Sequence, residues 1–280
     1  SIGSKRKDYI LNGKPVPFTT QLLFGFCDQF VLKNIKKLLG LNNCRYALSG
    51  AAPISPELID WYLSIGLDMR EGWGMTETAG IGTAFYSREI KKGCVGRAID
   101  GSEVQIAKDG EILFRGPGVF CGYLNKPEQT DETIIDGWLH TGDVGHLDNS
   151  GNLKITDRKK DIIITAGGKN ISPSEIENNI KTSPFIREAL VIGDDRKFLS
   201  ALIGIEFDIV SNWALRKNIP HTTYRNLSEN ENVQELIWSE VKKANERTSS
   251  LAIRKFRMIT KELDHEDGDM TATQKVKRNV

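Results

Sequence analysis

The sequence predicts an α/β protein, α+β in parts, with a large unit that contains a β-rich subdomain and a small α+β unit. Two observations favour this fold class. Residues 45–65 and 162–181 read as strand, small-residue loop and helix in succession, whereas residues 94–156 read as short alternating segments separated by turns. A charged run at 157–161 separates the two patterns, and we place the boundary there, between domains 1–158 and 159–280.

The first apolar stretch is predicted to be a buried helix. Its large apolar residues recur at helical spacing before a break at Gly40. They are Phe24, Phe26, Phe30, Val31, Ile35, Leu38 and Leu39. A short strand is expected at 45–50, followed by a helix with Ser55 as its N-cap and Pro56 at its first position.

Turn residues predict two hairpins inside the β-rich subdomain 94–156. The first joins 103–107 to 111–115 through Lys-Asp-Gly, and the second joins 145–147 to 152–156 through Asp-Asn-Ser-Gly. Beyond the charged run, strands are expected at 162–165, 188–192 and 199–205, and helices near 173–181, 208–217 and 231–247.

The composition is that of a globular protein with little net charge. Hydrophobic residues make up 39% and charged residues 27% of the chain. A formal charge of +1 excludes a global field that would attract nucleic acid, so any phosphate-binding site must be local. No apolar window approaches the length of a membrane span, which leaves peripheral membrane contact open.

The cysteines predict a cytoplasmic protein. No two of them are close enough in sequence for a CxxC metal or redox motif. We expect reduced, mostly buried thiols at Cys27, Cys44, Cys94 and Cys121.

Two small-residue segments stand at predicted strand ends, where open α/β sheets bind ligands. SGAAP at 49–53 lacks side-chain bulk, as a flat ring lying on backbone requires, although a tight core turn explains it equally well. GWGMTET at 72–78 supplies hard oxygens on Thr76 and Glu77 that suit Mg²⁺ bridging phosphates. A helix N-terminus capped by Thr76, and a core position for Trp73, are the alternatives.

Two further segments carry polar groups beside glycines. In DGWLHTGD at 136–143, the Asp143 carboxylate could accept from both hydroxyls of a ribose, or could form a turn. His140 has no obvious partner and is expected to be structural. Gly167 and Gly168, which follow DRKKD at 157–161, suit a narrow ligand or a strained turn.

In this order and spacing, the four segments resemble the core motifs of the adenylate-forming superfamily of acyl-CoA synthetases, peptide-synthetase adenylation domains and luciferases. Residues 136–161, DGWLHTGDVGHLDNSGNLKITDRKKD, are similar to the signature segment of fatty-acyl-CoA synthetases. The resemblance runs from about residue 40 to the end and is greatest to the long-chain branch. It implies a large AMP-binding domain, of which this chain contains the carboxyl-terminal part, and a small mobile domain.

The resemblance also implies an activity, that of a long-chain fatty-acid:CoA ligase. In such enzymes a fatty-acid carboxylate attacks the α-phosphate of ATP to give acyl-AMP and pyrophosphate, and the CoA thiol then takes the acyl group. A fatty acyl-AMP ligase and a non-catalytic module that binds a nucleotide or a partner are the alternatives. The implied small molecules are ATP, Mg²⁺, CoA and a fatty acid.

Residue roles follow from the resemblance alone. In the large domain, Thr76 would contact phosphate and Glu77 would hold Mg²⁺. The adenine pocket would be lined by Gly50, Ala51, Gly74 and Trp73, the last standing where Tyr is usual, and the ribose hydroxyls would be bound by Asp143 and Arg158.

In the small domain, the resemblance makes Lys160 the hinge and places Gly167 and Gly168 along the CoA tunnel. Lys275 would reach the carboxylate and α-phosphate during adenylation. A compact ammonium on a long stem suits oxygens that gain negative charge in the transition state. A basic solvated tail at 275–278 is the alternative.

One family motif is absent from the sequence. No Gly-, Ser- and Thr-rich phosphate loop precedes the other motifs, and the chain stops five residues after Lys275. We therefore expect a chain clipped at both ends that cannot adenylate alone. Its candidate protein partner is a separate amino-terminal half in trans, which would also supply most of the acyl tunnel.

Overall fold

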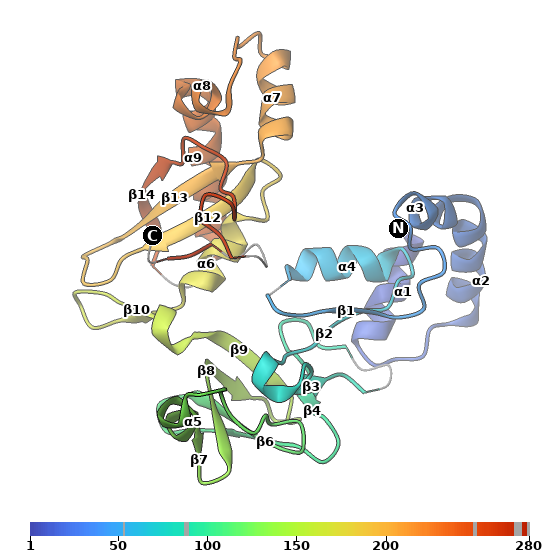
Figure 1. Ribbon diagram of the computed structural model, residues 1–280. Helices are drawn as coiled ribbons and strands as arrows, with labels where there is room; N and C mark the ends of the chain where they lie inside the picture. Colours follow the sequence, from blue (N-terminus) through green and yellow to red (C-terminus); the bar gives the residue numbers. More distant parts are fainter. Residues whose placement is uncertain (53, 87–89, 249–250, 272–275, 279–280) are drawn as a thin grey trace. The chain divides into compact units, whose positions relative to one another are not determined.

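The computed structural model describes residues 1–52, 54–86, 90–248, 251–271 and 276–278. The described chain divides into two compact units, Ser1–Lys159 and Lys160–Val280 (Figure 1). Both combine helices and sheets, which confirms the predicted α/β class. None of the helices in these ranges is long and apolar enough to cross a membrane.

Unit 1 begins with a group of helices: α1 (Ile2–Leu11), α2 (Phe18–Cys27), the π-helical turn η1 (Asp28–Leu32) and α3 (Lys33–Leu38). The predicted helix is present, but the expectation that it is buried is wrong. Phe24 alone of the seven apolar residues named for it is buried, whereas Phe26 is 68% and Leu38 88% exposed.

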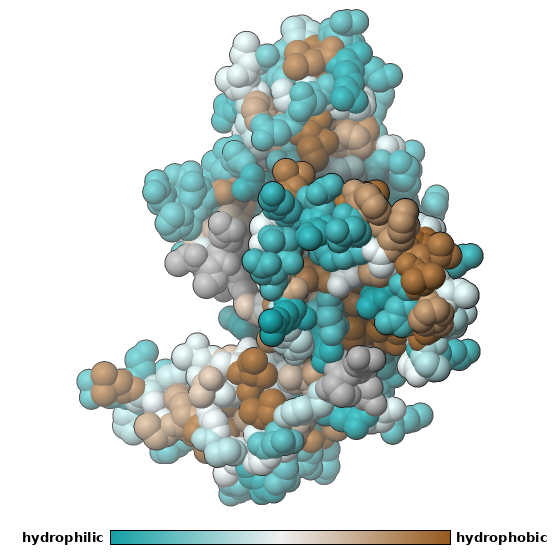
Figure 2. Space-filling view, turned by 90° about the vertical axis from the view of Figure 1, so that its right-hand side faces the viewer, coloured by the Kyte–Doolittle hydropathy of each residue, from teal (hydrophilic) through white to brown (hydrophobic). Residues whose placement is uncertain are grey.

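The exposed apolar residues of α2 and η1 surround an open groove of about 820 Å³. Figure 2 shows apolar side chains gathered on the face that carries these helices. The groove is lined by Phe18, Leu22, Leu23, Phe26 and Phe30, with Gln21, Gly25 and Gln29. Periodicity indicates which residues share a helix face, but it does not say whether that face is covered within the unit.

A strand–helix–strand element follows. The strands β1 (Ala47–Ser49) and β2 (Met69–Glu71) are parallel, and α4 (Pro56–Ser64) connects them. As predicted, Pro56 begins the helix and the Ser55 side chain caps it by accepting from the backbone N–H of Leu58. The buried residues Ile59 and Leu63 anchor α4 in a small apolar cluster.

The rest of unit 1 is rich in β-structure, as predicted. Its strands are β3 (Thr83–Ala84), β4 (Arg97–Ala98), β5 (Glu103–Ile106), β6 (Glu111–Arg115), β7 (Ile134–Ile135), β8 (Trp138–Leu147) and β9 (Leu153–Arg158), with the helix α5 (Pro127–Thr133) before β7. Both predicted hairpins are confirmed, because β5 pairs with β6 and β8 with β9, each antiparallel. β8 also pairs with β6 and β7, and so lies at the centre of this sheet.

Unit 2 begins within the turn η3 (Lys159–Asp161), which is followed by the short hairpin β10 (Ile163–Ile164) and β11 (Asn170–Ile171). Its main sheet has β13 (Leu199–Ile205) between antiparallel β12 (Ile186–Ile192) and parallel β14 (Ile253–Met258). Its helices are α6 (Pro173–Ile180), α7 (Phe207–Arg216), α8 (Tyr224–Glu229) and α9 (Glu231–Arg247).

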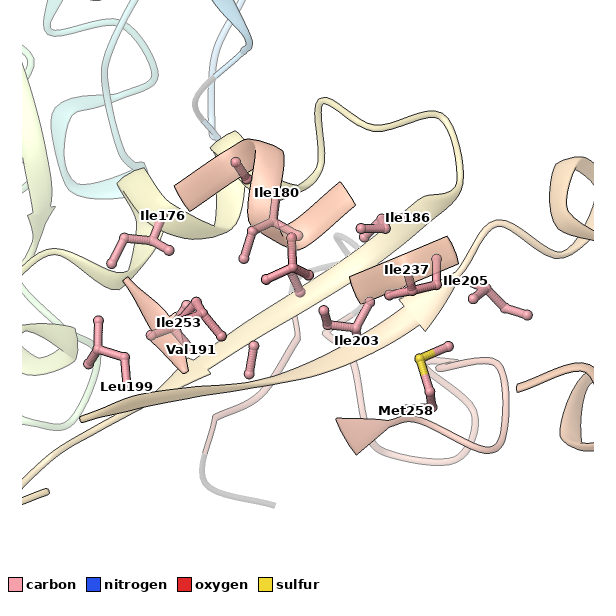
Figure 3. Close-up of a cluster of buried hydrophobic side chains, with 14 of the residues drawn as sticks. Ile176, Ile180, Ile186, Val191, Leu199, Ile203, Ile205, Ile237, Ile253 and Met258 are labelled. Atoms are coloured by element: carbon pink, nitrogen blue, oxygen red, sulfur yellow. The ribbon is translucent and has the colours of Figure 1, made fainter. Parts of the chain in front are cut away.

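The core of unit 2 lies between this sheet and the helices α6 and α9 (Figure 3). The apolar residues that α9 repeats at helical spacing all become buried: Val233, Ile237, Val241 and Ala244. On the sheet side, Leu199, Ile203 and Ile205 of β13 are fully buried. The sequence therefore predicted the bounds of this helix correctly.

Several expectations need correction. The sequence analysis overlooked α1, α5, α8 and β14, which are short or strongly polar segments. The cysteines are free, as expected, but only Cys94 is buried. Cys27 and Cys44 are half-buried and Cys121 is exposed.

We expect Ile237→Ala to lower the free energy of unfolding of unit 2 by about 2–4 kcal/mol, because it leaves a cavity in a closed core. The matched control is Ile209→Ala on the exposed side of α7, which should cost less than about 1 kcal/mol. Urea unfolding of the 280-residue chain, with hydrogen exchange of β12 and β13 to identify the unit, measures both. Equal losses would contradict the assignment of the core.

Candidate functional site

The first two small-residue segments lie next to each other at the carboxyl ends of the parallel strands β1 and β2. The backbone N–H of Gly72 donates to the carbonyl of Ser49 at 3.0 Å. A Cβ at Gly50 would lie 3.1 Å from the Gly72 carbonyl oxygen, so a side chain there would be crowded. Ala51 has φ 66°, the left-handed region, and both Gly50 and Ala51 are exposed. Exposed backbone therefore borders this edge of the sheet.

Glu71, the last residue of β2, is buried beside this edge and was missed by the sequence analysis. Its carboxylate accepts hydrogen bonds from the backbone N–H groups of Ile54 and Gly93. Burial raises the pKa of Glu71 to about 7 against these hydrogen bonds. The side chain thus connects the loop after β1 to the turn at Gly93. A carboxylate placed directly before Gly-Trp-Gly at the end of a strand was the available signal.

The GWGMTET segment forms a closed loop. The N–H and carbonyl groups of Trp73 bond Thr83, and a side chain at Gly74 would collide with the backbone of Gly80. Thr76 begins the 3₁₀ turn η2 (Thr76–Thr78), and Met75 occupies the N-cap position. The alternative in which Thr76 caps a helix is therefore wrong, and its side chain is exposed.

Glu77 is half-buried in the same turn and is held by a neighbouring segment. Tyr123 donates its hydroxyl to Glu77 Oε1 at 2.7 Å, and the Phe120 N–H donates to the Glu77 carbonyl at 2.9 Å. Burial and the contact with Glu77 raise the pKa of Tyr123, so the phenol keeps its proton. The loop that contains Phe120 and Tyr123 therefore orients a carboxylate that the sequence analysis assigned to Mg²⁺.

Asp143 brings two of the other predicted residues together. The indole Nε1–H of Trp73 donates to Asp143 Oδ2 at 2.8 Å, and Arg158 Nε lies 3.4 Å from Asp143 Oδ1. Asp143 and Arg158 are also directly opposite each other on β8 and β9. Residues from two separate segments therefore converge on the carboxylate of a third.

The surroundings of Asp143 differ from the prediction. It does not end a strand or form a turn, because it lies inside β8 among the alternately buried residues Leu139, Thr141 and Gly145. The residue is 9% exposed. The ring of Trp73 is also buried, packed edge-on against Phe114 with ring centroids 6.0 Å apart. The Trp73 ring thus occupies a core position, as the alternative prediction had it, while its N–H donates to the Asp143 carboxylate.

His140 has a carboxylate partner that the sequence analysis missed. Its Nδ1 lies 3.2 Å from Oε2 of Glu111, a buried residue on the neighbouring strand β6. Sequence spacing could not reveal this pair, because the two residues meet only when β6 and β8 align. The expectation that His140 is structural stays a prediction.

The remaining predicted residues belong to unit 2. Lys160 is its first residue and is exposed. Gly167 and Gly168 form the exposed turn between β10 and β11, and Gly168 has φ 73°, which favours glycine. Lys275 lies outside the described residues.

Within the described part of unit 1, the arrangement offers exposed backbone at one sheet edge, a hydroxyl and a carboxylate on one turn, and a carboxylate next to a guanidinium. Hydroxyl, carboxylate and guanidinium groups are those that recognise ribose and phosphate.

Comparison with known proteins identifies two matching family models. Residues 16–124 match the model described as AMP-binding enzyme, and residues 160–280 match the one described as AMP-binding enzyme C-terminal domain. Together the models extend over both units.

Two fatty-acid–CoA ligases of Mycobacterium are similar to most of this chain. The chain is 39% identical over 255 residues to a long-chain-fatty-acid–CoA ligase, FadD15 of Mycobacterium bovis, with 90% of this chain and 42% of that protein covered. It is 36% identical over 281 residues to a fatty-acid–CoA ligase described as putative, fadD11 of Mycobacterium tuberculosis, with 99% and 49% covered. The chain thus spans about half the length of these relatives.

A solved structure agrees in fold. The o-succinylbenzoate CoA synthetase of Bacillus subtilis, in complex with its acyl-adenylate intermediate, matches with a TM-score of 0.64 and 27% identity. The match covers 84% of this chain and 45% of the synthetase.

We expect the pH dependence of stability to reveal the buried carboxyl of Glu71. Because the pKa is raised in the folded protein, the folded state binds more protons than the unfolded state between pH 4.5 and about 7. Its contribution to stability is therefore present at low pH and is lost as the pH rises through that range. Relative to that of the native protein, the free energy of unfolding of Glu71→Gln should therefore rise by roughly 1–3 kcal/mol between pH 5 and pH 8.

Urea unfolding at both pH values measures this gain, with the exposed Glu57→Gln of α4 as the matched control. If the free-energy difference between Glu71→Gln and the native chain is the same at pH 5 and pH 8, the carboxyl does not titrate in that range.

Proposed function

This chain belongs to the family of AMP-binding enzymes, and we propose that it carries the carboxyl-terminal part of a long-chain fatty-acid:CoA ligase. The reaction converts ATP, a fatty acid and CoA into acyl-CoA, AMP and pyrophosphate through an acyl-adenylate. The observation that carries the proposal is the convergence of Trp73, Asp143 and Arg158. The names of FadD15 and fadD11 support the choice of a fatty acid as the substrate.

The proposed ribose site is built around Asp143. An ionised carboxylate can accept hydrogen bonds from both hydroxyls of a ribose, and the contacts with Trp73 and Arg158 hold this carboxylate in place. The buried indole fixes the direction of the carboxylate, while the exposed Arg158 can move towards the ligand. Gly50, Ala51 and Gly74 supply backbone against which an adenine ring could lie.

The proposed phosphate site is on η2. The exposed Thr76 hydroxyl would contact phosphate, and the half-buried Glu77 carboxylate fits a Mg²⁺ ion that takes its other ligands from phosphate and water. That ion would neutralise phosphate charge when bound. The o-succinylbenzoate CoA synthetase of Bacillus subtilis has also been solved in complex with ATP and a magnesium ion, which supports ATP and Mg²⁺ as the bound molecules.

In unit 2, we place the hinge at Lys160, directly after the last residue of unit 1, and assign the turn at Gly167 and Gly168 to the CoA tunnel. Lys275 would stabilise the charge on the attacking carboxylate and the α-phosphate. One face of the small domain would then serve adenylation and another thioester formation, and the backbone change would be confined to a few hinge residues.

The proposal is tested by measuring fatty-acid-dependent conversion of ATP to AMP, with and without CoA. The 280-residue chain is assayed alone and with the amino-terminal half of FadD15 supplied in trans. We expect activity only on complementation, because the family's phosphate loop is not among these residues. CoA-dependent acyl-CoA formation supports the ligase, whereas acyl-AMP that accumulates regardless of CoA supports an acyl-AMP ligase. ATP binding without turnover in any mixture supports a binding module.

We expect Asp143→Asn to raise the KM for ATP in the complemented enzyme by roughly 10- to 100-fold. The amide is a weaker acceptor than the carboxylate for two ribose hydroxyls and no longer attracts Arg158. Asp131→Asn, an exposed change on α5, is the control. An unchanged KM for ATP in Asp143→Asn would remove Asp143 from the nucleotide site.

A further inference from the structure

Glu111, the first residue of β6, is a buried carboxylate on which donors from three positions converge. Its Oε1 accepts from the backbone N–H of Gly142 at 2.9 Å, and its Oε2 lies 3.0 Å from Nζ of Lys159 and 3.2 Å from Nδ1 of His140. Only 6% of Glu111 is exposed. Burial alone would raise the pKa of Glu111, but the bonds from Lys159, Gly142 and His140 outweigh it and lower the pKa. The group is therefore an anion at neutral pH.

The contact with Gly142 acts on the proposed ribose site. Gly142 has φ 70°, and Asp143 follows it directly. The pairing of β6 with β8 shifts register between Glu111 and Leu113, and the pairing of β8 with β9 shifts between Val144 and Gly145. Where the ladder is irregular, the carboxylate accepts the Gly142 N–H and so fixes the peptide between Thr141 and Gly142, one residue before Asp143.

The contact with Lys159 acts on the last residue of unit 1. The ammonium of Lys159 lies 2.7 Å from Asp109 Oδ2 and 3.0 Å from Glu111 Oε2, and both carboxylates raise the pKa of this lysine. Asp109 and Glu111 flank Gly110, whose carbonyl accepts from the Gly145 N–H of β8. The β5–β6 turn therefore holds β8 through its backbone and Lys159 through its side chains.

We propose that Glu111 is a positioning residue with two connections: through Gly142 it aims Asp143, and through Lys159 it fixes the chain immediately before the hinge at Lys160. This inference rests on the proposed function. A hinge confines a backbone change to a few residues only if the residues before it are held. One buried carboxylate would then set both the ribose contact and the point at which rotation begins.

The first test requires no catalytic activity. Hydrogen exchange is measured on the 280-residue chain for the native protein, Glu111→Gln and Lys159→Met. The control is Glu103→Gln, an exposed glutamate of β5 that pairs with Arg115 of β6 in the same hairpin. We expect Glu111→Gln to speed exchange of residues 159–163 about tenfold and of Gly142 about threefold, because hydrogen bonds to a charged acceptor are the stronger ones.

Lys159→Met should speed exchange only at 159–163. Adding it to Glu111→Gln should have less than the additive effect there, because both changes break the contact between Lys159 and Glu111, and only the lysine change also breaks the contact with Asp109. Lys159 is exposed, so this variant keeps the test informative if Glu111→Gln folds poorly. Exchange in both variants that equals that of Glu103→Gln would overturn the proposal.

The second test uses the chain complemented with the amino-terminal half of FadD15. Glu111→Gln should raise the KM for ATP several-fold and change the ratio of adenylation rate to thioester formation from supplied acyl-AMP, whereas Lys159→Met should change the ratio alone. An unchanged ratio in both variants counts against the hinge role of Glu111. If exchange changes in the variants while no mixture adenylates, including the one with the native chain, the result supports Glu111 as a positioning residue and counts against the ligase assignment instead.

Discussion

The hydrogen bond from Trp73 to Asp143 is the constraint on which the candidate site of unit 1 depends. It joins residues 70 positions apart in sequence. A carboxylate placed on the buried face of β8 is costly unless it is hydrogen-bonded and paired. The indole satisfies it from the core side and Arg158 from the exposed side. Because the Trp73 ring packs against Phe114, apolar packing also fixes the direction of the polar group.

Two buried glutamates of unit 1 show how partners decide the effect of burial. Glu71 accepts from neutral backbone donors, and its pKa is raised to about 7. Glu111 is buried to a similar degree but has Lys159 within 3.0 Å, and its pKa is lowered. Desolvation raises the pKa at both residues, and at Glu111 the bonds from Lys159, Gly142 and His140 outweigh it. The Glu71 carboxyl can therefore change its protonation near neutral pH, whereas the Glu111 carboxyl is ionised there.

Local signals predicted the elements they act on. Ser55-Pro56 and Ser172-Pro173 begin helices for two reasons. The serine hydroxyl accepts from an otherwise unpaired backbone N–H, and the proline ring fixes the backbone of the first turn. The exposed apolar residues of α2 and η1 show where such signals stop. Phe24 and Phe26 lie two positions apart in one helix, yet Phe24 is 9% and Phe26 68% exposed. Helical spacing is a property of the segment, whereas burial depends on what packs against it.

The α/β class, the two hairpins, the capped helices and the motifs that identify the family could be predicted from the sequence, because each is encoded in neighbouring residues. The tertiary structure alone decided that Asp143 lies inside a strand, that Trp73 and Arg158 share its carboxylate, and that Glu71 and Glu111 are buried at all. The reason is physical. The protonation and direction of a side chain depend on desolvation and on charges within a few ångströms, and those partners come from strands that meet only in the folded chain.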